Sequence, residues 1–496
     1  MEAMVDANTI TDVIDVLSHM KRQNGAVTED FIHGPSEFEV REQNIQMPLL
    51  SKSLRRLRAS RDLFQILLKI YDSKIDVIEN KCTPYFLKKG IKSLPDDVLR
   101  HVFEVGYEEE DIRECTSFST HVSSISRRFR RVALESPRIW TRLHNYMSRK
   151  LLRLLISRSK DAGIHIHLTD LWYPVNDGLE FMRVAVSECR RWETFMFHFT
   201  TPQIGLSTCQ TFSNLNLPRL STLSLRCSYY DATESEVAGS IASIWTLPSV
   251  RYFTIHNANI NGTTSWTSLS SFDIILDNLY EEDKWDMWQV LRGVGGMPSL
   301  ESLSLHFIAV SGFDTLSGME SFRLTVPNLR TLTYIFECCD PELVLTPLLG
   351  KIILPGLLNL KVEFRGCEID SGIWVGFLFE GSNPYPSLRN FALKQYDSIL
   401  NECELDMVQN AVPSLKHVSL EGLCTYVSPP DPGHSWETLR INHLDYMDEE
   451  TITSIAETLM EDPAFKRLDI IRCRRVSLRC LMALKARMGS KLFYEL

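Results

Sequence analysis

The chain has 496 residues, of which 44% are hydrophobic and 23% are charged. These proportions are those of an ordinary globular protein and exclude wholesale disorder, a collagen-like chain and a mucin-like stalk. The length predicts about three structural units, or one long repeat array with appendages. No run approaches the roughly 18 apolar residues of a membrane-spanning helix, and an acidic start replaces a secretory signal. We therefore expect a cytoplasmic or nuclear protein without a membrane partner.

The twelve cysteines are spread from Cys82 to Cys480 and form no Cys-x-x-Cys pair. This spacing disfavours a zinc site or a redox motif and predicts buried, reduced thiols. We accordingly expect neither a cofactor nor a metal ion.

The net charge of −10 is unevenly distributed along the chain. Residues 1–50 have a net charge of −6, residues 51–160 have +11, and residues 161–496 have −15. A basic segment joined to an acidic body predicts two different partners, because opposite charges steer association. The basic segment would suit an acidic protein or nucleic acid, and the acidic body would suit a basic target protein.

Two segments precede the most informative part of the chain. Residues 1–46 are rich in acid and turn formers, and we expect a flexible leader there. Residues 47–90 carry a heptad pattern that predicts a long amphipathic helix. Its seam positions, apolar except for the arginine, are Leu54, Leu57, Arg61, Phe64, Leu68, Tyr71, Ile75, Ile78 and Cys82. The helix could form a coiled-coil homodimer or fold back on its own protein, and the pattern leaves both open.

Residues 91–145 predict a small helical module. Pro95, followed by two aspartates, is typical of the first turn of a helix, where carboxylates lie near the positive end of the helix dipole. An apolar stripe follows on this helix, and an acidic loop at 108–111 separates it from a second helix. That second helix combines an apolar side with four arginines within 127–131. Pro137 ends it, and a third short element begins near Trp140.

The order and spacing of these residues resemble an F-box, particularly the F-box-like proteins common in fungi. The resemblance covers about 50 of the 496 residues. It lies in Leu-Pro-Asp-Asp-Val-Leu from Leu94, Val-Phe at 102–103, Ser-Ile-Ser-Arg-Arg-Phe-Arg-Arg-Val-Ala from Ser124, and Ser-Pro-Arg-Ile-Trp from Ser136. Two positions depart from the family pattern, with Phe129 where the family usually has Trp and Ser126 where it often has Cys.

The resemblance implies a three-helix module that binds a Skp-family adaptor and, through it, a cullin ubiquitin ligase. Independently, a unit of this size buries only about 60% of its surface alone, so its apolar faces need the rest of the chain or a partner. The adaptor-binding residues that the resemblance implies are Leu94, Pro95, Val98, Leu99, Val102, Phe103, Ile125, Phe129, Ala133, Pro137 and Trp140.

A linker helix and a first solenoid element are expected at residues 146–190, and the rest of the chain, residues 191–496, repeats. Each unit has a leucine, two spacers, an apolar residue, one spacer and another apolar residue, with steps of about 19 to 31 residues between units. The unit anchors are Trp192, Pro218, Pro248, Leu269, Pro298, Pro327, Pro355, Pro386, Pro413, Trp436 and Phe465. The pattern resembles irregular leucine-rich repeats, which implies an α+β or α/β solenoid of short strands.

Side chains alternate along a strand, so the residues between the apolar positions point outward. In a curved array this outward set lines the concave face, where a target protein would bind. The candidate target-binding residues are Arg226, Tyr252, His256, His306, Lys361, Glu363, Lys394, Glu421 and Arg440.

Catalytic signatures are missing from the sequence. It has no Gly-x-Ser-x-Gly, no His-Glu-x-x-His and no phosphate loop ending in Gly-Lys-Ser or Gly-Lys-Thr. The pair His165 and His167 is better explained by a strand than by a metal site. Two hypotheses remain: a non-catalytic substrate receptor of a Skp-cullin-F-box ubiquitin ligase, and a repeat scaffold whose F-box-like helices serve internal packing or dimerisation. Nucleic acid binding through the arginine run is disfavoured.

Overall fold

The computed structural model divides the chain into two units, Met1–Leu99 and Arg100–Leu496. In the second unit it describes residues 100–112, 114–170, 175–228, 243–258, 266–278, 287–310, 323–345, 351–367, 378–379, 385–396, 405–422, 427, 430, 435–445 and 447–495. In the first unit it describes residues 14, 18, 58, 61, 64, 65, 68, 69, 71–78, 81, 90, 91 and 94–99. Across these residues, none of the helices has the length and apolar character needed to span a bilayer.

The described positions between 58 and 81 are all helical, as the heptad pattern predicts. Its seam is open to solvent at Leu68, Tyr71, Ile75 and Ile78, which are 62%, 62%, 49% and 60% exposed. The seam residues Leu54, Leu57 and Cys82 lie outside the described residues. An exposed apolar seam of this kind is what a coiled-coil partner would cover.

The predicted module at 91–145 contains α4 (Asp96–Glu109), α5 (Cys115–Ile125), α6 (Arg127–Glu135) and the 3₁₀ helix η1 (Pro137–Trp140). Where we expected one second helix, the structure has two, so that prediction is wrong. The break is at Ser126, whose backbone is extended and whose hydroxyl accepts a hydrogen bond from the N–H of Phe129 at 3.1 Å. Ser126 thus ends α5 and caps α6, because its side chain satisfies a free amide of the new helix.

Fourteen strands of the described chain form one parallel sheet, in the order β1-β2-β3-β4-β5-β6-β7-β9-β11-β12-β13-β14-β15-β16. In this order they are Arg142–His144, Ile164–Thr169, Trp192–Phe199, Thr222–Cys227, Tyr252–His256, Ser271–Asp277, Ser302–Ile308, Thr331–Glu337, Asn359–Arg365, Asn390–Tyr396, His417–Glu421, Thr438–Asn442, Arg467–Ile471 and Leu492–Glu495. The short strands β8 (Leu324–Thr325) and β10 (Ile352–Ile353) pair separately. The expected α/β repeat architecture is therefore confirmed.

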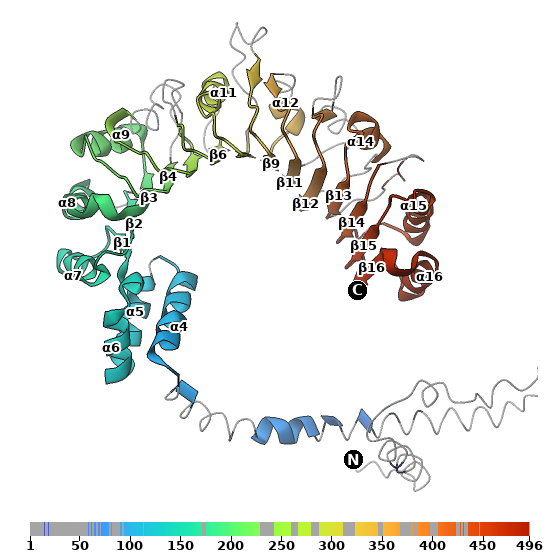
Figure 1. Cartoon of the computed structure of the whole chain (residues 1–496), viewed down its shortest axis with the longest axis horizontal. Coiled ribbons are helices and arrows are strands. Elements are labelled where there is room, and N and C mark those ends of the chain that lie inside the picture. The colour runs from blue at the N-terminus through green and yellow to red at the C-terminus, as the bar shows by residue number, and fades with distance from the viewer. Residues whose placement is uncertain are drawn as a thin grey trace, which may run out of the picture. The chain divides into compact units, whose positions relative to one another are not determined.

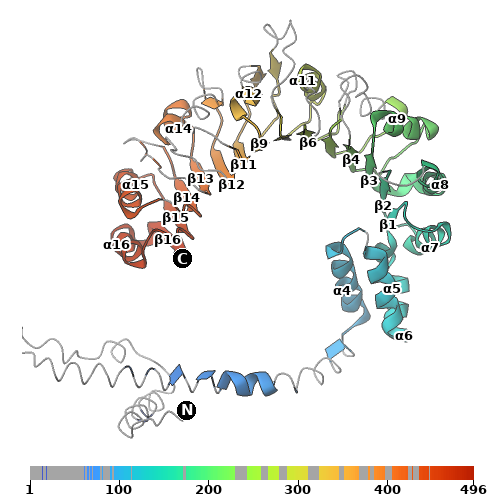
Figure 2. The same ribbon diagram turned by 180° about the vertical axis from the view of Figure 1, so that it is seen from behind.

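Within Arg100–Leu496 the strands line the inner side of an arc and the helices lie on its outer side (Figures 1 and 2). The outer elements are α7 (Arg149–Ser159), α8 (Val175–Ala185), η2 (Val186–Arg191), α9 (Pro202–Thr211), α11 (Met287–Gly295), α12 (Pro341–Leu345), α14 (Leu405–Ala411), α15 (Glu449–Glu461), α16 (Leu478–Met488) and η4 (Gly489–Lys491). Because helices cover only one side of the sheet, the inner face is left for other contacts.

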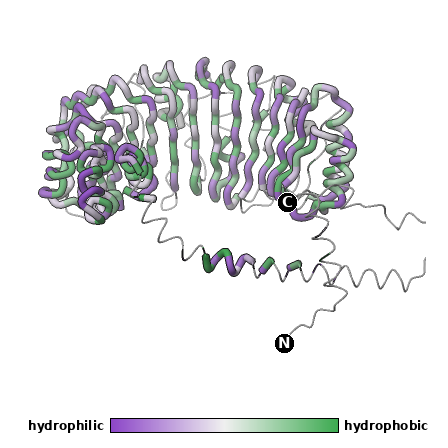
Figure 3. Tube along the Cα trace, turned by 60° about the horizontal axis from the view of Figure 1, so that its bottom comes forward, coloured by the Kyte–Doolittle hydropathy of each residue, from purple (hydrophilic) through white to green (hydrophobic). Residues whose placement is uncertain are grey.

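Burial alternates along the strands, and hydropathy alternates with it (Figure 3). The buried side chains face the helices and stack from strand to strand. The rings of Phe307, Phe336 and Phe364, for example, follow one another with centroids 5.6 and 5.4 Å apart. Each repeat therefore completes the core of its neighbours, as in other solenoids.

The predicted anchors lie at the first residue of a strand or a few residues before it. After the anchor proline, a polar side chain often bonds to the repeat before it: Ser249 donates to the carbonyl of Pro218, and Ser387 to that of Pro355, both at 2.7 Å. Asn328 does the same to Pro298 at 2.8 Å. These bonds hold the segments before β5, β9 and β12 against the previous repeat.

Candidate functional site

The first candidate surface is an apolar stripe on α4. Val102 is 52% exposed and Val105 is 40% exposed, and we call these two residues the α4 stripe. Among the other residues of 91–145, Val98, Ile125 and Leu134 are 41%, 56% and 37% exposed. Val102 and Val105 are three residues apart and lie on one face of the helix, so their exposed side chains are available to a partner.

Other residues implied by the F-box resemblance are in the interior. Leu99, Phe103, Ala133 and Trp140 are 3%, 4%, 0% and 1% exposed. The Phe103 ring contacts the Phe129 ring at a centroid distance of 5.2 Å, and the Trp140 indole donates to the carbonyl of Ala133 at 2.8 Å. We therefore correct the expectation that these four residues touch an adaptor, because their side chains are buried. Leu94, Phe129 and Pro137 are half-buried, and Pro95 is exposed.

Arg142 on β1 ties the module to the sheet. Its guanidinium donates to the carbonyls of Tyr107, Glu108 and Glu110 at 3.1, 3.1 and 2.8 Å, and its backbone N–H donates to the Tyr107 hydroxyl at 2.9 Å. A cation at the C-terminal end of α4 satisfies carbonyls that the helix leaves free. Burial raises the pKa of Tyr107 to about 12, so this hydroxyl stays protonated.

A groove of about 820 Å³ lies between the end of α4 and strands β1 to β3. Its charged lining residues are Glu104, Glu108, Glu110, Asp111, Asp161, Glu193, Arg138, Arg142 and Arg219. His165 and His167 also line it, on the strand that the sequence predicts, and burial lowers the pKa of both, that of His167 to about 4. Both imidazoles are neutral at neutral pH and add no positive charge. The groove is therefore acidic, because its six carboxylates outnumber its three arginines.

The second candidate surface is the inner face of the sheet, where parallel register brings the outward residues into rows. One row contains Arg226, His256, His306, Glu363, Lys394 and Glu421. All six come from the predicted target-binding set, so the structure brings these residues together on one surface. Lys361 and Arg440 lie in the next row of the same face, and Tyr252, 54% exposed, lies in the row beyond it.

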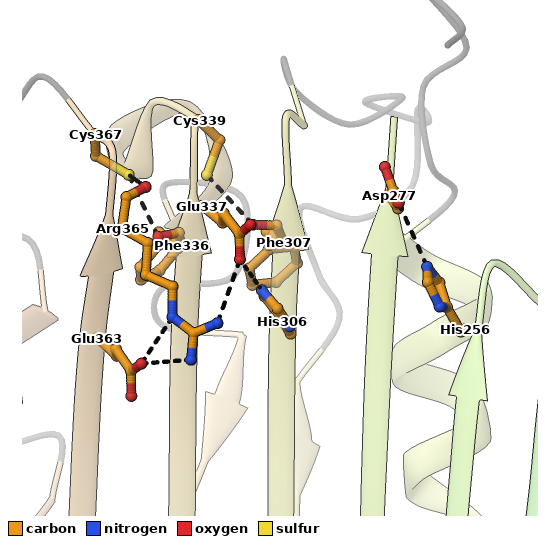
Figure 4. A network of polar contacts seen from close by, with 10 residues as sticks. All are labelled: His256, Asp277, His306, Phe307, Phe336, Glu337, Cys339, Glu363, Arg365 and Cys367. Atoms are coloured by element: carbon orange, nitrogen blue, oxygen red, sulfur yellow. Dashed lines mark hydrogen bonds and ion pairs between the residues drawn. The ribbon is translucent and has the colours of Figure 1, made fainter. Parts of the chain in front are cut away.

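A network of ion pairs, joined by a hydrogen bond from His306, crosses three strands of this face (Figure 4). His306 Nε2 lies 3.1 Å from Glu337 Oε2, which is 3.4 Å from Arg365 Nη1. Arg365 Nη2 is in turn 2.6 Å from Glu363 Oε1, and Lys361 Nζ is 2.7 Å from Glu363 Oε2. We call these five residues the inner-face network. Its carboxylates are already paired with cations of the same chain.

Glu363 is the most enclosed member of the network, at 3% exposure. Burial alone would raise its pKa, but the hydrogen bonds from Lys361 and Arg365 hold the pKa below its ordinary value. Further along, Glu421 is paired with Lys394 at 2.6 Å, and its pKa is lowered in the same way against the effect of burial. Glu363 and Glu421 therefore act first as parts of the scaffold.

Three histidines of the inner face, His198, His256 and His306, are neutral at neutral pH. Burial and the nearby Arg226 guanidinium lower the pKa of His198 and of His256 to about 4. His256 Nε2 also lies 3.5 Å from Asp277 Oδ2, which opposes the shift without cancelling it (Figure 4). Burial likewise lowers the pKa of His306. Arg226 and Arg440 are both exposed, and neither forms an ion pair with any residue in the described ranges.

Asp277, Glu337 and Arg365 were not among the residues predicted from the sequence. Each occupies the last outward position of its strand, two residues beyond the row described above. In the sequence, each of the three is a charged residue that continues the period-2 pattern of its strand. Which charges pair, however, depends on the register between strands. In the described part of the chain, no group of three or more His, Cys, Asp or Glu side chains is arranged to hold a metal ion.

Comparisons with known proteins add little. No protein-family model matches the sequence, and no curated protein matches it either. Among solved structures, a crystal structure of a Bacteroides fragilis protein is similar over 66% of this chain and 84% of that chain, with 13% sequence identity and a TM-score of 0.30. A likeness at this level carries no conclusion about family or function.

Proposed function

We propose that the chain is a substrate-recognition subunit of a Skp-cullin-F-box ubiquitin ligase. In this proposal the helices α4 to α6 bind a Skp-family adaptor, the adaptor recruits a cullin, and the repeats, irregular leucine-rich repeats in type, bind a target protein. The chain itself performs no chemistry. It raises the concentration of the target near the enzyme that transfers ubiquitin, which is sufficient to accelerate the transfer.

The observation that carries the proposal is the exposed α4 stripe. Val102 and Val105 are open to solvent, whereas Phe103 beside them is buried. Two uncovered apolar side chains on one helix face support the docking of a partner there. The arginines at 127 and 131 on α6, both exposed, would favour an acidic adaptor.

The target would bind the inner face or the adjoining groove. On the inner face the exposed Arg226, Tyr252 and Arg440 are the best candidates for direct contact, because Glu363 and Glu421 are already paired within the chain. The groove carboxylates would suit a basic segment of a target, in keeping with the acidic charge of residues 161–496. Cytoplasm and nucleus both contain this class of ligase.

The second candidate function is a non-catalytic repeat scaffold that dimerises through the heptad helix. The exposed seam at Leu68, Tyr71, Ile75 and Ile78 favours it. The two proposals differ in one experiment, co-purification with a Skp-family adaptor. Adaptor binding that is lost on Val102→Glu with Val105→Glu, in a folded protein, supports the receptor. A protein that binds no adaptor and is dimeric supports the scaffold.

A further inference from the structure

Neighbouring helices on the outer side contact each other through fixed positions, and α15 and α16 show which ones. Glu449 of α15 accepts a hydrogen bond from the N–H of Ser477 at 2.9 Å. One turn on, the Thr453 hydroxyl lies 3.9 Å from Cys480 Sγ. Another turn on, Glu457 pairs with Arg487 at 2.8 Å. Glu449, Thr453 and Glu457 therefore form the side of α15 that faces the next repeat.

The same three positions of α16 are apolar. Leu439 is in register with Leu468, which makes the step between these two repeats 29 residues. An offset of 29 residues also superimposes the buried positions of the two helices. The buried Ile452, Ile455 and Leu459 of α15 correspond to the buried Leu481, Leu484 and Met488 of α16. The same offset relates Glu449, Thr453 and Glu457 to Leu478, Met482 and Ala486.

These three side chains are exposed at the side of α16 where a further repeat would pack. Leu478 is 48% exposed and Met482 is 58% exposed, and Ala486 is exposed as well. We call Leu478, Met482 and Ala486 the terminal face. Positions that are polar on α15 are therefore apolar and exposed on α16. A cluster of exposed apolar side chains on one helix side is typical of an interaction site.

The charge around the terminal face indicates what kind of partner would cover it. Residues 465–496 contain nine Lys or Arg and two Asp or Glu. Five of these cations pair with carboxylates of the same chain, whereas Arg479 and Lys485 on α16 are exposed and form no ion pair with any described residue. Arg479 is exposed next to Leu478, and Lys485 on the same helix donates to the carbonyl of Leu492. An apolar stripe beside like charges repels a second copy of itself and attracts an acidic partner.

We propose that the terminal face binds an amphipathic helix of a partner protein, with the apolar side of that helix packed on Leu478, Met482 and Ala486 and with acidic residues flanking it. A helix is the expected form, because the face continues the helix-on-helix packing of the outer layer. This interaction is separate from the adaptor and target surfaces proposed above. It does not depend on the chain being a ligase subunit.

The test uses the full chain and a variant that gives α16 the residues of α15 at the terminal face, Leu478→Glu with Met482→Thr and Ala486→Glu. Random helical peptides displayed on phage are selected on the wild-type chain. Selected peptides are then synthesised with a fluorophore, and their binding is measured by anisotropy. The control variant is Leu343→Glu, which charges another exposed apolar residue of the outer layer, 52% exposed on α12.

We expect the selected peptides to carry acidic residues beside an apolar stripe, to bind the triple variant about 10-fold more weakly or worse, and to bind Leu343→Glu as tightly as wild type. Circular dichroism should be the same for all three proteins. The proposal is overturned if no peptide is selected, if the peptides are not acidic, or if the triple variant binds them equally well. It is also overturned if the wild-type chain forms a dimer that the triple variant loses, because a second copy would then be the occupant.

Discussion

The Glu363 carboxylate lies 2.6 Å from the Arg365 guanidinium on the inner face, although Glu363 is only 3% exposed. A buried carboxylate is tolerated because cations and hydrogen bonds surround it. Lys361 and Arg365, in contrast, remain partly exposed and can be rehydrated. The pair therefore stabilises the fold, and we expect a change at Glu363 to cost more stability than a change at Lys361 or Arg365.

Glu363→Ala should lower the free energy of unfolding by about 1–3 kcal/mol, since it removes charged hydrogen bonds. The pKa of Glu363 is held below its ordinary value, so its stabilisation is present above about pH 4.3, the unfolded value, and is lost as pH falls through the lower folded value. Urea unfolding of wild type and variant across acidic pH measures both effects. A difference in stability that persists at the lowest pH would contradict the assignment.

In the described part of the chain, seven strands are followed by a residue with positive φ, and the N–H of that residue donates a hydrogen bond to the neighbouring strand. One of these residues is Gly422, which has a φ of 124° and donates to the carbonyl of Asn442. A Cβ on Gly422 would lie 2.1 Å from the carbonyl oxygen of Gln395. Gly422→Ala should therefore destabilise the protein by at least about 2 kcal/mol. Thermal unfolding measures the change, and an unaltered midpoint would refute the geometry.

Ala309 occupies the equivalent position after β7, with φ 53°. A side chain is unfavourable in this region of backbone conformation, where glycine is not. Ala309→Gly should accordingly raise the free energy of unfolding by about 0.5–1 kcal/mol, the opposite sign to an ordinary Ala→Gly change. Thermal unfolding again measures the change. The control is Ala456→Gly, buried in α15, which should lower stability, and a loss of stability in both variants would contradict the argument.

His256 should make the protein less stable in mild acid. Its folded pKa is about 4, against about 6.5 when unfolded. As pH falls from about 6.5 towards 4, the unfolded chain takes up a proton that the folded protein refuses, so stability is lost over that range. The groups facing it are Arg226 on β4, Asp277 on β6 and His306 on β7.

The variant His256→Gln should flatten the dependence of unfolding free energy on pH between about 6.5 and 4. His121→Gln, an exposed position on α5, is the matched control and should leave the slope as it is. Identical slopes for wild type and His256→Gln would show that the histidine is not held neutral.

Within the module, truncation of Phe103 should destabilise the protein strongly, whereas truncation of Val102 should have little effect. Phe103→Ala removes a buried ring that contacts Phe129 and should cost about 3–5 kcal/mol. Val102→Ala, at 52% exposure, should change stability by less than about 0.5 kcal/mol. Chemical denaturation of the two variants decides this, and equal losses would mean that Val102 is also interior.

Much of the repeat architecture could be predicted from sequence, because the proline anchors and the period-2 apolar pattern are local signals. The pairing of Glu337 with Arg365 could not, since it depends on the register of β9 and β11. Positive φ at Ala309 was equally hidden, because the residue there is not glycine. In the module, an apolar stripe gave no means of separating the exposed Val102 from the buried Phe103.

The account rests on the α4 stripe as an adaptor-binding surface, and direct binding to a purified Skp-family adaptor tests it. Calorimetry should show binding by the wild-type chain and by the control Leu343→Glu. It should show none, or binding weakened by at least about 100-fold, for Val102→Glu with Val105→Glu, whose circular dichroism should match wild type. Undiminished binding by that double variant, or no binding by the folded wild-type chain, would contradict the account.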